Sequence, residues 1–269
     1  MDAQHGMSVG SFNVLHPPYA VKYADREGIN ARGQSNWVER LPAIAAVLLA
    51  HDLDVYLLQE VGPAEMDDLR AHLGASYAVV YARHPARGSQ RADGSWTGGD
   101  GVALLLRAER VDNIEPAEPA HHCGWAWVPE SPYMATAIAH VLHKPSGARV
   151  LLASVHLYDK KAHQPQRTLL AHLAARAEQL RPDAVVWGGD CNRLYGPFEV
   201  PGFACAPAVR ATRPRSRKAI DWIFARSASA PLAPVRTEAT EAFVRATLEP
   251  RMLSDHCAEA VVVAITRET

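Results

Sequence analysis

Hydrophobic and polar positions follow two periods along the chain, one typical of strands and one typical of helices. Short apolar runs rich in branched residues predict strands, and apolar residues three and four positions apart predict amphipathic helices. The expected strands are 8–15, 54–59, 77–82, 102–107, 136–143, 150–156, 184–188, 220–225 and 258–265. The expected helices are 37–50, 63–73 and 164–180.

Too few of these strands are followed by a helix for a doubly wound parallel sheet. The pattern therefore predicts an α/β protein in which two mixed sheets pack together and helices cover the outside. A turn signal at 143–147 predicts a hairpin between two neighbouring strands. Segments 83–99 and 201–218 are expected to be long loops, and loops of such length often carry function.

Composition excludes several classes of protein. The 269 residues are 48% hydrophobic and 21% charged, which is ordinary for a folded globular chain. No apolar run reaches the roughly 20 residues that span a bilayer, and the first residues lack the pattern of a signal peptide. A net charge of −1 argues against a generally cationic nucleic-acid binder but leaves room for a local basic patch. The four cysteines lack zinc-site spacing, so we expect reduced thiols, a cytoplasmic location and no membrane partner.

Polar residues able to do chemistry recur at the ends of the expected strands. They are Asn13, Glu60, His156, Asp190 with Asn192, Asp221, and Asp255 with His256. Taken alone, each has a plain structural explanation as a turn former, a helix-entry charge or a buried histidine. Because strand ends are rigid and can converge, the ordered set predicts one catalytic cleft.

The same positions lie in motifs that resemble the exonuclease/endonuclease/phosphatase superfamily, which has the DNase I-like fold. The matching stretches are FNVL (12–15), LLQEV (57–61), GDGVALLLR (99–107), SVHLY (154–158), GGDCN (188–192), AIDWIF (219–224) and SDH (254–256). The resemblance implies a four-layer α/β/β/α sandwich and a single catalytic domain over residues 1–269. Tyr19 after FNVL, and Trp37 with Arg40 ahead of LLQEV, are most similar to the deadenylase, nocturnin, Angel and 2′-phosphodiesterase branch.

This resemblance implies a divalent-metal site. Glu60 would ligate Mg²⁺ or Mn²⁺, with Asn13 beside it, and such hard cations prefer oxygen ligands. Asp190 would orient and deprotonate the attacking water. Asn192 would hold the same water or a phosphate oxygen.

The resemblance also assigns two histidines. His256, paired with Asp255, would help neutralise the phosphoryl group in the transition state, since a carboxylate fixes the tautomer and charge of an imidazole. His156 would donate to a second phosphoryl oxygen. Asp221 would hold His156 or a metal-bound water.

Basic residues near these motifs are candidates for binding substrate. Five positive charges fall within 210–218, and this cluster would attract a phosphate backbone if it flanks the cleft, although charge runs are often only solvated loops. The substrate-binding candidates are Lys160, Arg167, Arg215, Arg217 and Lys218.

Three functions remain open. The first is a metal-dependent phosphodiesterase that trims RNA or an oligonucleotide from the 3′ end. The second is a phosphatase or cyclic phosphodiesterase acting on a nucleotide or an RNA-end phosphate. The third, a non-catalytic binding module, is disfavoured because a scaffold gains nothing from several like charges in one cleft. No obligate protein partner is inferred. Family deadenylases stack adenine on an aromatic residue where this chain has Ser216, so no preference for adenine is expected.

Overall fold

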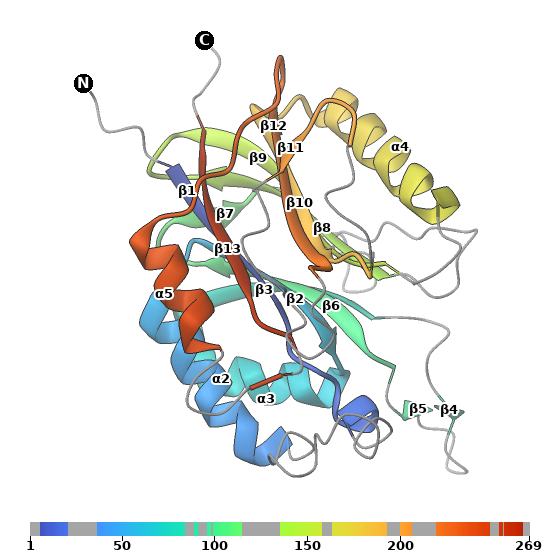
Figure 1. Ribbon diagram of the computed structural model, residues 1–269, viewed down its shortest axis with the longest axis vertical. Coiled ribbons are helices and arrows are strands. Elements are labelled where there is room, and N and C mark those ends of the chain that lie inside the picture. The colour runs from blue at the N-terminus through green and yellow to red at the C-terminus, as the bar shows by residue number, and fades with distance from the viewer. Residues whose placement is uncertain are drawn as a thin grey trace.

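A computed structural model describes residues 6–20, 37–83, 89–90, 96–97, 99–114, 135–157, 163–192, 200–205, 219–247, 253–254 and 256–265. In this part of the chain two β-sheets pack face to face, and helices cover their outer faces (Figure 1). The four-layer α/β/β/α sandwich expected from the sequence is confirmed.

One sheet has five strands and the other has six. The five-stranded sheet runs in the order β13 (Glu259–Ala264), β1 (Gly6–Asn13), β2 (Val55–Val61), β6 (Gly101–Arg107) and β3 (Tyr77–Arg83). The six-stranded sheet runs β11 (Ala204–Cys205), β12 (Asp221–Ser227), β10 (Ala184–Asp190), β9 (Ala148–His156), β8 (Ala135–His143) and β7 (Val111–Asn113). Only β1–β2 and β9–β10 pair in parallel among the strands of these two sheets. A small separate ribbon joins β4 (Ser89–Gln90) to β5 (Trp96–Thr97).

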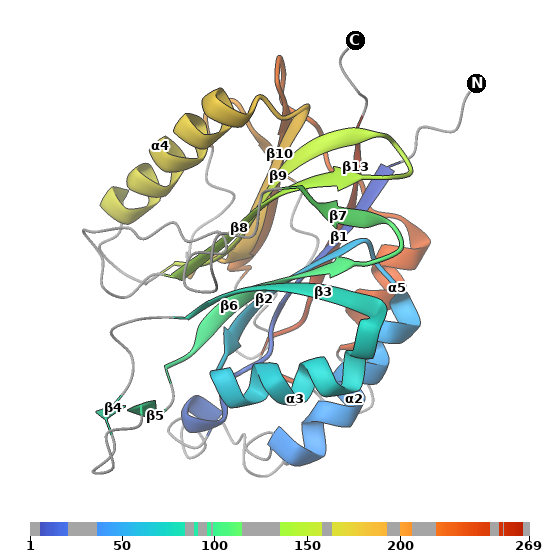
Figure 2. The ribbon, with the colours of Figure 1, turned by 180° about the vertical axis from the view of Figure 1, so that it is seen from behind.

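The helices divide between the two outer faces (Figures 1 and 2). The five-stranded sheet is covered by α2 (Trp37–His51), α3 (Pro63–Leu73) and α5 (Glu238–Ala246), and a 3₁₀ turn at Gly74–Ser76 follows α3. The six-stranded sheet is covered by α4 (His163–Leu180). No helix in the described ranges has both the length and the apolar character that crossing a membrane requires.

Hydrophobic side chains fill three layers. Leu57 and Leu152 belong to the layer between the sheets, and Tyr56 belongs to the layer beneath α2 and α5. Trp187 packs in the third layer, beneath α4. Since β2 and β10 are buried on both faces, their sequences read as continuous apolar runs rather than as alternating patterns.

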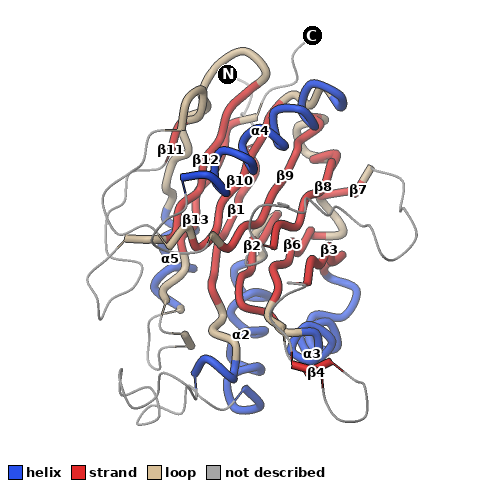
Figure 3. The backbone as a smooth tube through the Cα atoms, turned by 90° about the vertical axis from the view of Figure 1, so that its right-hand side faces the viewer, coloured by secondary structure: helices blue, strands red, loops and turns tan. Residues whose placement is uncertain are grey.

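Figure 3 shows the strands of both sheets, and their register brings polar residues at several strand ends to one end of the sandwich. Asp190 at the end of β10 lies opposite His156 in the parallel strand β9 and opposite Asp221 in the antiparallel strand β12. Asn13 of the other sheet ends beside Gln59 of β2. Residues far apart in the sequence therefore meet at one end of the sandwich.

Several described elements were not predicted, among them the two-residue strands β4, β5 and β11, which lie in segments expected to be loops. The short helix α5 was not predicted, because its buried face consists only of Thr240, Phe243 and Val244 and its capping box uses Thr237 and Thr240 instead of the more telling glutamate. The strand β7 has three residues, too few for a periodic pattern. The ends of the predicted strands shift by at most two residues from their predicted bounds. Most of both expected loops lies outside the described residues.

Gly189 has a conformation that other residues rarely adopt. Its φ is 144°, and a Cβ at this position would overlap the carbonyl oxygen of Val155 in the neighbouring strand. The glycine therefore allows β10 to approach β9 closely, directly before Asp190. Gly189 is thus a residue of strand β10 and not part of a tight turn.

We expect Gly189→Ala to lower the free energy of unfolding by about 3 kcal/mol or more, because backbone strain and overlap add together. Gly147→Ala is the control, since Gly147 also has positive φ but no atom lies within 4 Å of its added Cβ. That control should lose only about 1 kcal/mol. Urea denaturation followed by tryptophan fluorescence measures both, and equal losses would show that the overlap at 189 is relieved without cost.

Candidate active site

Asp190 lies at the centre of the polar cluster. Its Oδ2 accepts a hydrogen bond from Asn13 Nδ2 at 3.0 Å, and its Oδ1 accepts one from the backbone N–H of Asn192 at 2.8 Å. The Nε2 atoms of His156 and His256 lie 3.6 and 3.7 Å from the same Oδ2. Asp190 is 2% exposed. Burial raises the pKa of Asp190, which the neighbouring Asp221 reinforces, whereas His256 and His156 act in the opposite direction.

Glu60 occupies a β-bulge in β2. The register of the pairing with β6 shifts between Gln59 and Val61, on either side of Glu60, whose φ is 58°. Its Oε1 accepts a hydrogen bond from Asn13 Nδ2 at 3.0 Å, and its Oε2 accepts one from the backbone N–H of His16 at 3.2 Å. The bulge interrupts the ladder at this position, and the Glu60 carboxylate lies beside Asn13, close to Asp190.

Backbone strain concentrates around this carboxylate. Five non-glycine residues in the described part of the chain have positive φ, and three of them are Leu15, Glu60 and Asn192. Leu15 lies two residues beyond the end of β1, Asn192 lies two residues beyond the end of β10, and Glu60 is next to the last residue of β2. Such conformations cost about 1–3 kcal/mol each, and their clustering is typical of functional sites.

Asn13 connects the two sheets. Its Nδ2 donates to both Glu60 and Asp190, and its Oδ1 accepts a hydrogen bond from the backbone N–H of Leu15 at 3.0 Å. The expected place of Asn13 beside the metal stays a prediction, since its Oδ1 keeps a second lone pair beside this hydrogen bond. Asn13 holds the two carboxylates in position.

His256 is partnered by Asp221. Its Nδ1 lies 2.9 Å from Asp221 Oδ2, and both side chains are buried. Asp221 was expected to hold His156 or a metal-bound water; strand register places it across β10 from His156, and its carboxylate lies next to His256. Asp255, the expected partner of His256, lies outside the described residues.

His156 has a different carboxylate beside it. Its Nδ1 lies 3.7 Å from Oδ2 of Asp100, and its Nε2 lies 3.1 Å from Asn192 Nδ2, which also donates to the Leu157 carbonyl oxygen. With Asn192 as donor, the neutral imidazole carries its proton on Nδ1, the nitrogen that faces Asp100. Burial alone lowers the pKa of His156, but Asp100, Asp190 and Glu60 together raise it above the ordinary value.

Asp100 was not among the site residues predicted from the sequence. It is 2% exposed and directly precedes β6. Its motif, the GDG at 99–101, was used only as a mark of resemblance. An acidic residue beside an otherwise apolar buried strand is the signal that could have identified it.

Gln59 supports the site from beneath. Its Nε2 donates to the Leu57 carbonyl oxygen at 2.9 Å and lies 3.3 Å from Ser154 Oγ in the other sheet. Ser154 Oγ in turn donates to the Leu58 carbonyl oxygen. This polar bridge links the two sheets. Gln59 therefore supports the site, whereas the adjacent Glu60 belongs to the cluster around Asp190.

Arg40 of α2 holds two loops of the site. Its guanidinium donates to the carbonyl oxygens of Val14 and Leu15, just after Asn13, and to that of Leu253, shortly before His256. The three donor–acceptor distances are 2.6, 2.7 and 2.8 Å, and Arg40 is buried. Arg40 of the W-x-x-R pattern thus has a structural role, because its planar guanidinium joins the segment after β1 to the segment before His256.

We expect Arg40→Lys to lower the free energy of unfolding by about 2–4 kcal/mol, because an ammonium cannot satisfy all three carbonyl groups. Arg70→Lys is the control on the helix surface, where Arg70 pairs with Asp67 and both side chains are exposed. It should change the free energy by less than about 0.5 kcal/mol. Urea denaturation compares the two, and a similar small effect at both positions would remove the role given to Arg40.

Within the described ranges, two overlapping groups of side chains could hold a metal ion. Glu60, His156 and Asp190 form one, and Asp190, Asp221 and His256 form the other, with ligand atoms in each group within 4.8 Å of one another. Among the expected substrate-binding residues, Arg167 is exposed on α4. Lys160, Arg215, Arg217 and Lys218 lie outside the described residues.

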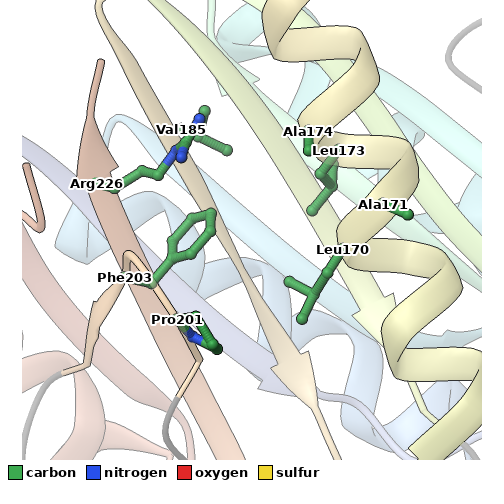
Figure 4. A pocket seen from close by; sticks show the side chains of 8 residues that line it. All are labelled: Leu170, Ala171, Leu173, Ala174, Val185, Pro201, Phe203 and Arg226. Atoms are coloured by element: carbon green, nitrogen blue, oxygen red, sulfur yellow. The ribbon is translucent and has the colours of Figure 1, made fainter. Parts of the chain in front are cut away.

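A cavity of about 310 Å³ lies elsewhere, between α4 and the outer face of the six-stranded sheet (Figure 4). Its walls are mostly apolar, with Phe203, Leu170 and Val185 among them and Arg226 as the one charged residue. Val185 faces α4 and lies near the start of β10, whereas Asp190 ends that strand. The cavity is therefore separate from the polar cluster.

A model of a known protein family matches most of the chain. The family model described as "Endonuclease/Exonuclease/phosphatase family" matches residues 10–256. A search of curated proteins found no match.

Solved structures share the fold at low sequence identity. The human nocturnin catalytic domain with bound sulfate is 19% identical, covers 97% of this chain and 94% of its own, and has a TM-score of 0.67. A mannosyl-6-phosphatase from Bacteroides thetaiotaomicron is 20% identical with coverages of 96% and 99% and a TM-score of 0.64. D. rerio TDP2 in complex with a single-stranded DNA product is 19% identical, with coverages of 96% and 99% and a TM-score of 0.62.

Proposed function

Because the chain belongs to the endonuclease/exonuclease/phosphatase family, and is thus a hydrolase of phosphate esters, we propose that it cuts phosphodiester bonds of RNA or oligonucleotides from the 3′ end. One observation carries the proposal most directly. Side chains from both sheets converge on Asp190, so that carboxylates and imidazoles lie within a few ångströms of one another, as binding a metal and a phosphoryl group requires.

Asp190 is the group proposed to orient the attacking water and accept its proton. Asn13 and the backbone of Asn192 hold its two oxygens in a fixed direction, which removes the cost of arranging them during the reaction. Its raised pKa makes it a stronger base than an exposed aspartate. The water attacks phosphorus in line with the leaving oxygen, and no covalent intermediate with the protein forms.

The two histidines are proposed to stabilise the charge that develops on the phosphoryl oxygens. Asp221 holds Nδ1 of His256, which leaves Nε2 directed toward Asp190 and the cleft. Nε2 of His156 lies between Glu60 and Asp190, and in the imidazolium form, which these carboxylates favour, both ring nitrogens can donate. Preorganised donors of this kind commonly supply the largest share of catalysis in phosphoryl transfer.

The donor set fits a divalent cation. Glu60 lies at the bulge with positive φ, and each of its carboxylate oxygens accepts one hydrogen bond. Each oxygen has a further lone pair that could bind a cation. Mg²⁺ or Mn²⁺ binds through one or two carboxylates together with water and substrate phosphate oxygens. Glu60 would hold the ion, with Asp190 within reach. When bound, it would withdraw charge from the phosphoryl oxygens and steady the leaving oxygen.

The choice of a polynucleotide rests on the motif pattern, which resembles the deadenylase and nocturnin branch, and on the basic cluster at 210–218. TDP2, as a structural neighbour, has a DNA product bound. A second candidate is a phosphate monoester, because the mannosyl-6-phosphatase has the same fold. In both cases the proposal treats residues 1–269 as one catalytic domain, since Asn13 and His256 serve the same site.

The test presents both substrate classes to the protein with Mg²⁺ or Mn²⁺. A 5′-labelled single-stranded RNA is followed on a sequencing gel, and a panel of nucleoside monophosphates is followed by release of inorganic phosphate. We expect a ladder of shortened RNA without phosphate release. Phosphate release with intact RNA would overturn the nuclease in favour of the phosphatase, and inactivity on both classes would overturn the proposal. Asp190→Asn serves as the inactive control.

A further inference from the structure

Tyr19 lies outside the group of side chains that would meet the substrate, yet it is joined to it. It belongs to a helical turn, 17–20, directly after β1. Backbone N–H groups of Tyr19 and Ala20 both donate to the His16 carbonyl oxygen, at 2.8 and 3.1 Å. The ring packs edge-on against that of His16, with centroids 5.4 Å apart. The turn therefore holds the phenol in a defined place.

The phenol oxygen donates a hydrogen bond to Oδ1 of Asp100 at 3.1 Å. The other carboxylate oxygen, Oδ2, lies 3.7 Å from Nδ1 of His156. Asp100 is almost wholly buried, and a buried carboxylate needs fixed donors. One oxygen is thus held by Tyr19 while the other faces the imidazole.

The contacts of His156 Nε2 explain why the orientation of the Asp100 carboxylate is important. This nitrogen faces the cleft, close to Asn192 Nδ2 and Asp190 Oδ2. A rotation of the Asp100 carboxylate would remove the acceptor that favours a proton on Nδ1, and the imidazole could then present the wrong nitrogen or the wrong tautomer to the substrate.

We infer that Tyr19 is a positioning residue, which fixes Asp100 and, through it, the tautomer and direction of His156. The inference rests on the proposed phosphoesterase function for its kinetic consequence. In this role the Tyr19 hydroxyl acts on catalysis through Asp100.

Four proteins test this dependence: Tyr19→Phe, Asp100→Asn, the double variant, and Tyr77→Phe as control. Tyr77 donates to the Leu53 carbonyl oxygen at the far end of the five-stranded sheet, so its variant loses a comparable hydroxyl. Tyr19→Phe should lower kcat about tenfold with KM nearly unchanged, which is typical for the loss of a group that orients a site residue. In the Asp100→Asn background the same substitution should cost nothing further.

Equal losses from Tyr19→Phe in both backgrounds, or a loss confined to KM, would overturn the inference. A second readout does not require activity. Long-range ¹H–¹⁵N spectra of labelled protein report which ring nitrogen of His156 carries the proton, with His156→Gln to assign the signal. Tyr19→Phe should change this pattern and Tyr77→Phe should not; an unchanged pattern would refute the role of Tyr19. An inactive wild-type protein would overturn the proposed function alone, because the spectra still test the link.

Discussion

Asp190→Asn lowers kcat by about a thousandfold or more, within the range that removal of a positioned base produces. The amide keeps the size of the side chain and can still accept the hydrogen bond from the backbone of Asn192. It cannot take a proton from water, and its NH₂ group would face the Asn13 donor or the two histidines. The loss should therefore appear in the chemical step and not in the fold.

Steady-state kinetics on the preferred phosphate ester, with circular dichroism to confirm folding, measures this effect. Asp183→Asn is a matched control, because Asp183 is also buried and lies just before the opposite end of the same strand, where it accepts a hydrogen bond from the Arg149 N–H. It should retain nearly full kcat. Asp190→Asn with more than a tenth of wild-type activity, or Asp183→Asn equally impaired, would remove Asp190 from the proposed mechanism.

Glu60→Gln should raise the metal concentration for half-maximal activity at least about tenfold, and lower activity at a fixed low metal concentration about a hundredfold. The amide is isosteric but has lost the charge that attracts a divalent cation. It also places an NH₂ group near Asn13 Nδ2 or the His16 N–H, where two acceptor oxygens were required.

Titration of activity with Mn²⁺ gives the activation curve of each variant. Glu65→Gln is the control, since Glu65 lies nearby on α3, 3.8 Å from His16 Nε2, but not among the clustered ligand atoms of the described residues. We expect its curve to overlay that of the wild type. A Glu60→Gln curve with an unchanged midpoint would show that the metal, if needed, is held elsewhere.

The main elements of the fold could be predicted from the sequence because their signals are local. The helix at Pro63–Leu73 begins with proline and stops before Gly74, and the doubly buried strands β2 and β10 read as unbroken apolar runs. The helix α5 was missed because its buried face is only three residues wide. The superfamily is confirmed, whereas the branch within it stays a prediction.

The composition of the site could be predicted, but its pairing could not. That Asp190, His156 and Asp221 end up side by side depends on register, which a single sequence does not reveal. The same limit explains why the contact of Asp221 with His256 was not foreseen and why Asp100 was overlooked. The bulge that redirects Glu60 also leaves no sequence mark, because the residue there is not a glycine.

Release of 4-nitrophenolate from bis(4-nitrophenyl) phosphate, measured with Mn²⁺ and with a chelator, tests most directly whether this cleft is a metal-dependent phosphoesterase site. We expect the wild-type protein to hydrolyse the ester only with the metal, and Asp190→Asn to be inactive under both conditions. Equal rates for wild type and Asp190→Asn, or wild-type activity that persists in the chelator, would contradict the assignment.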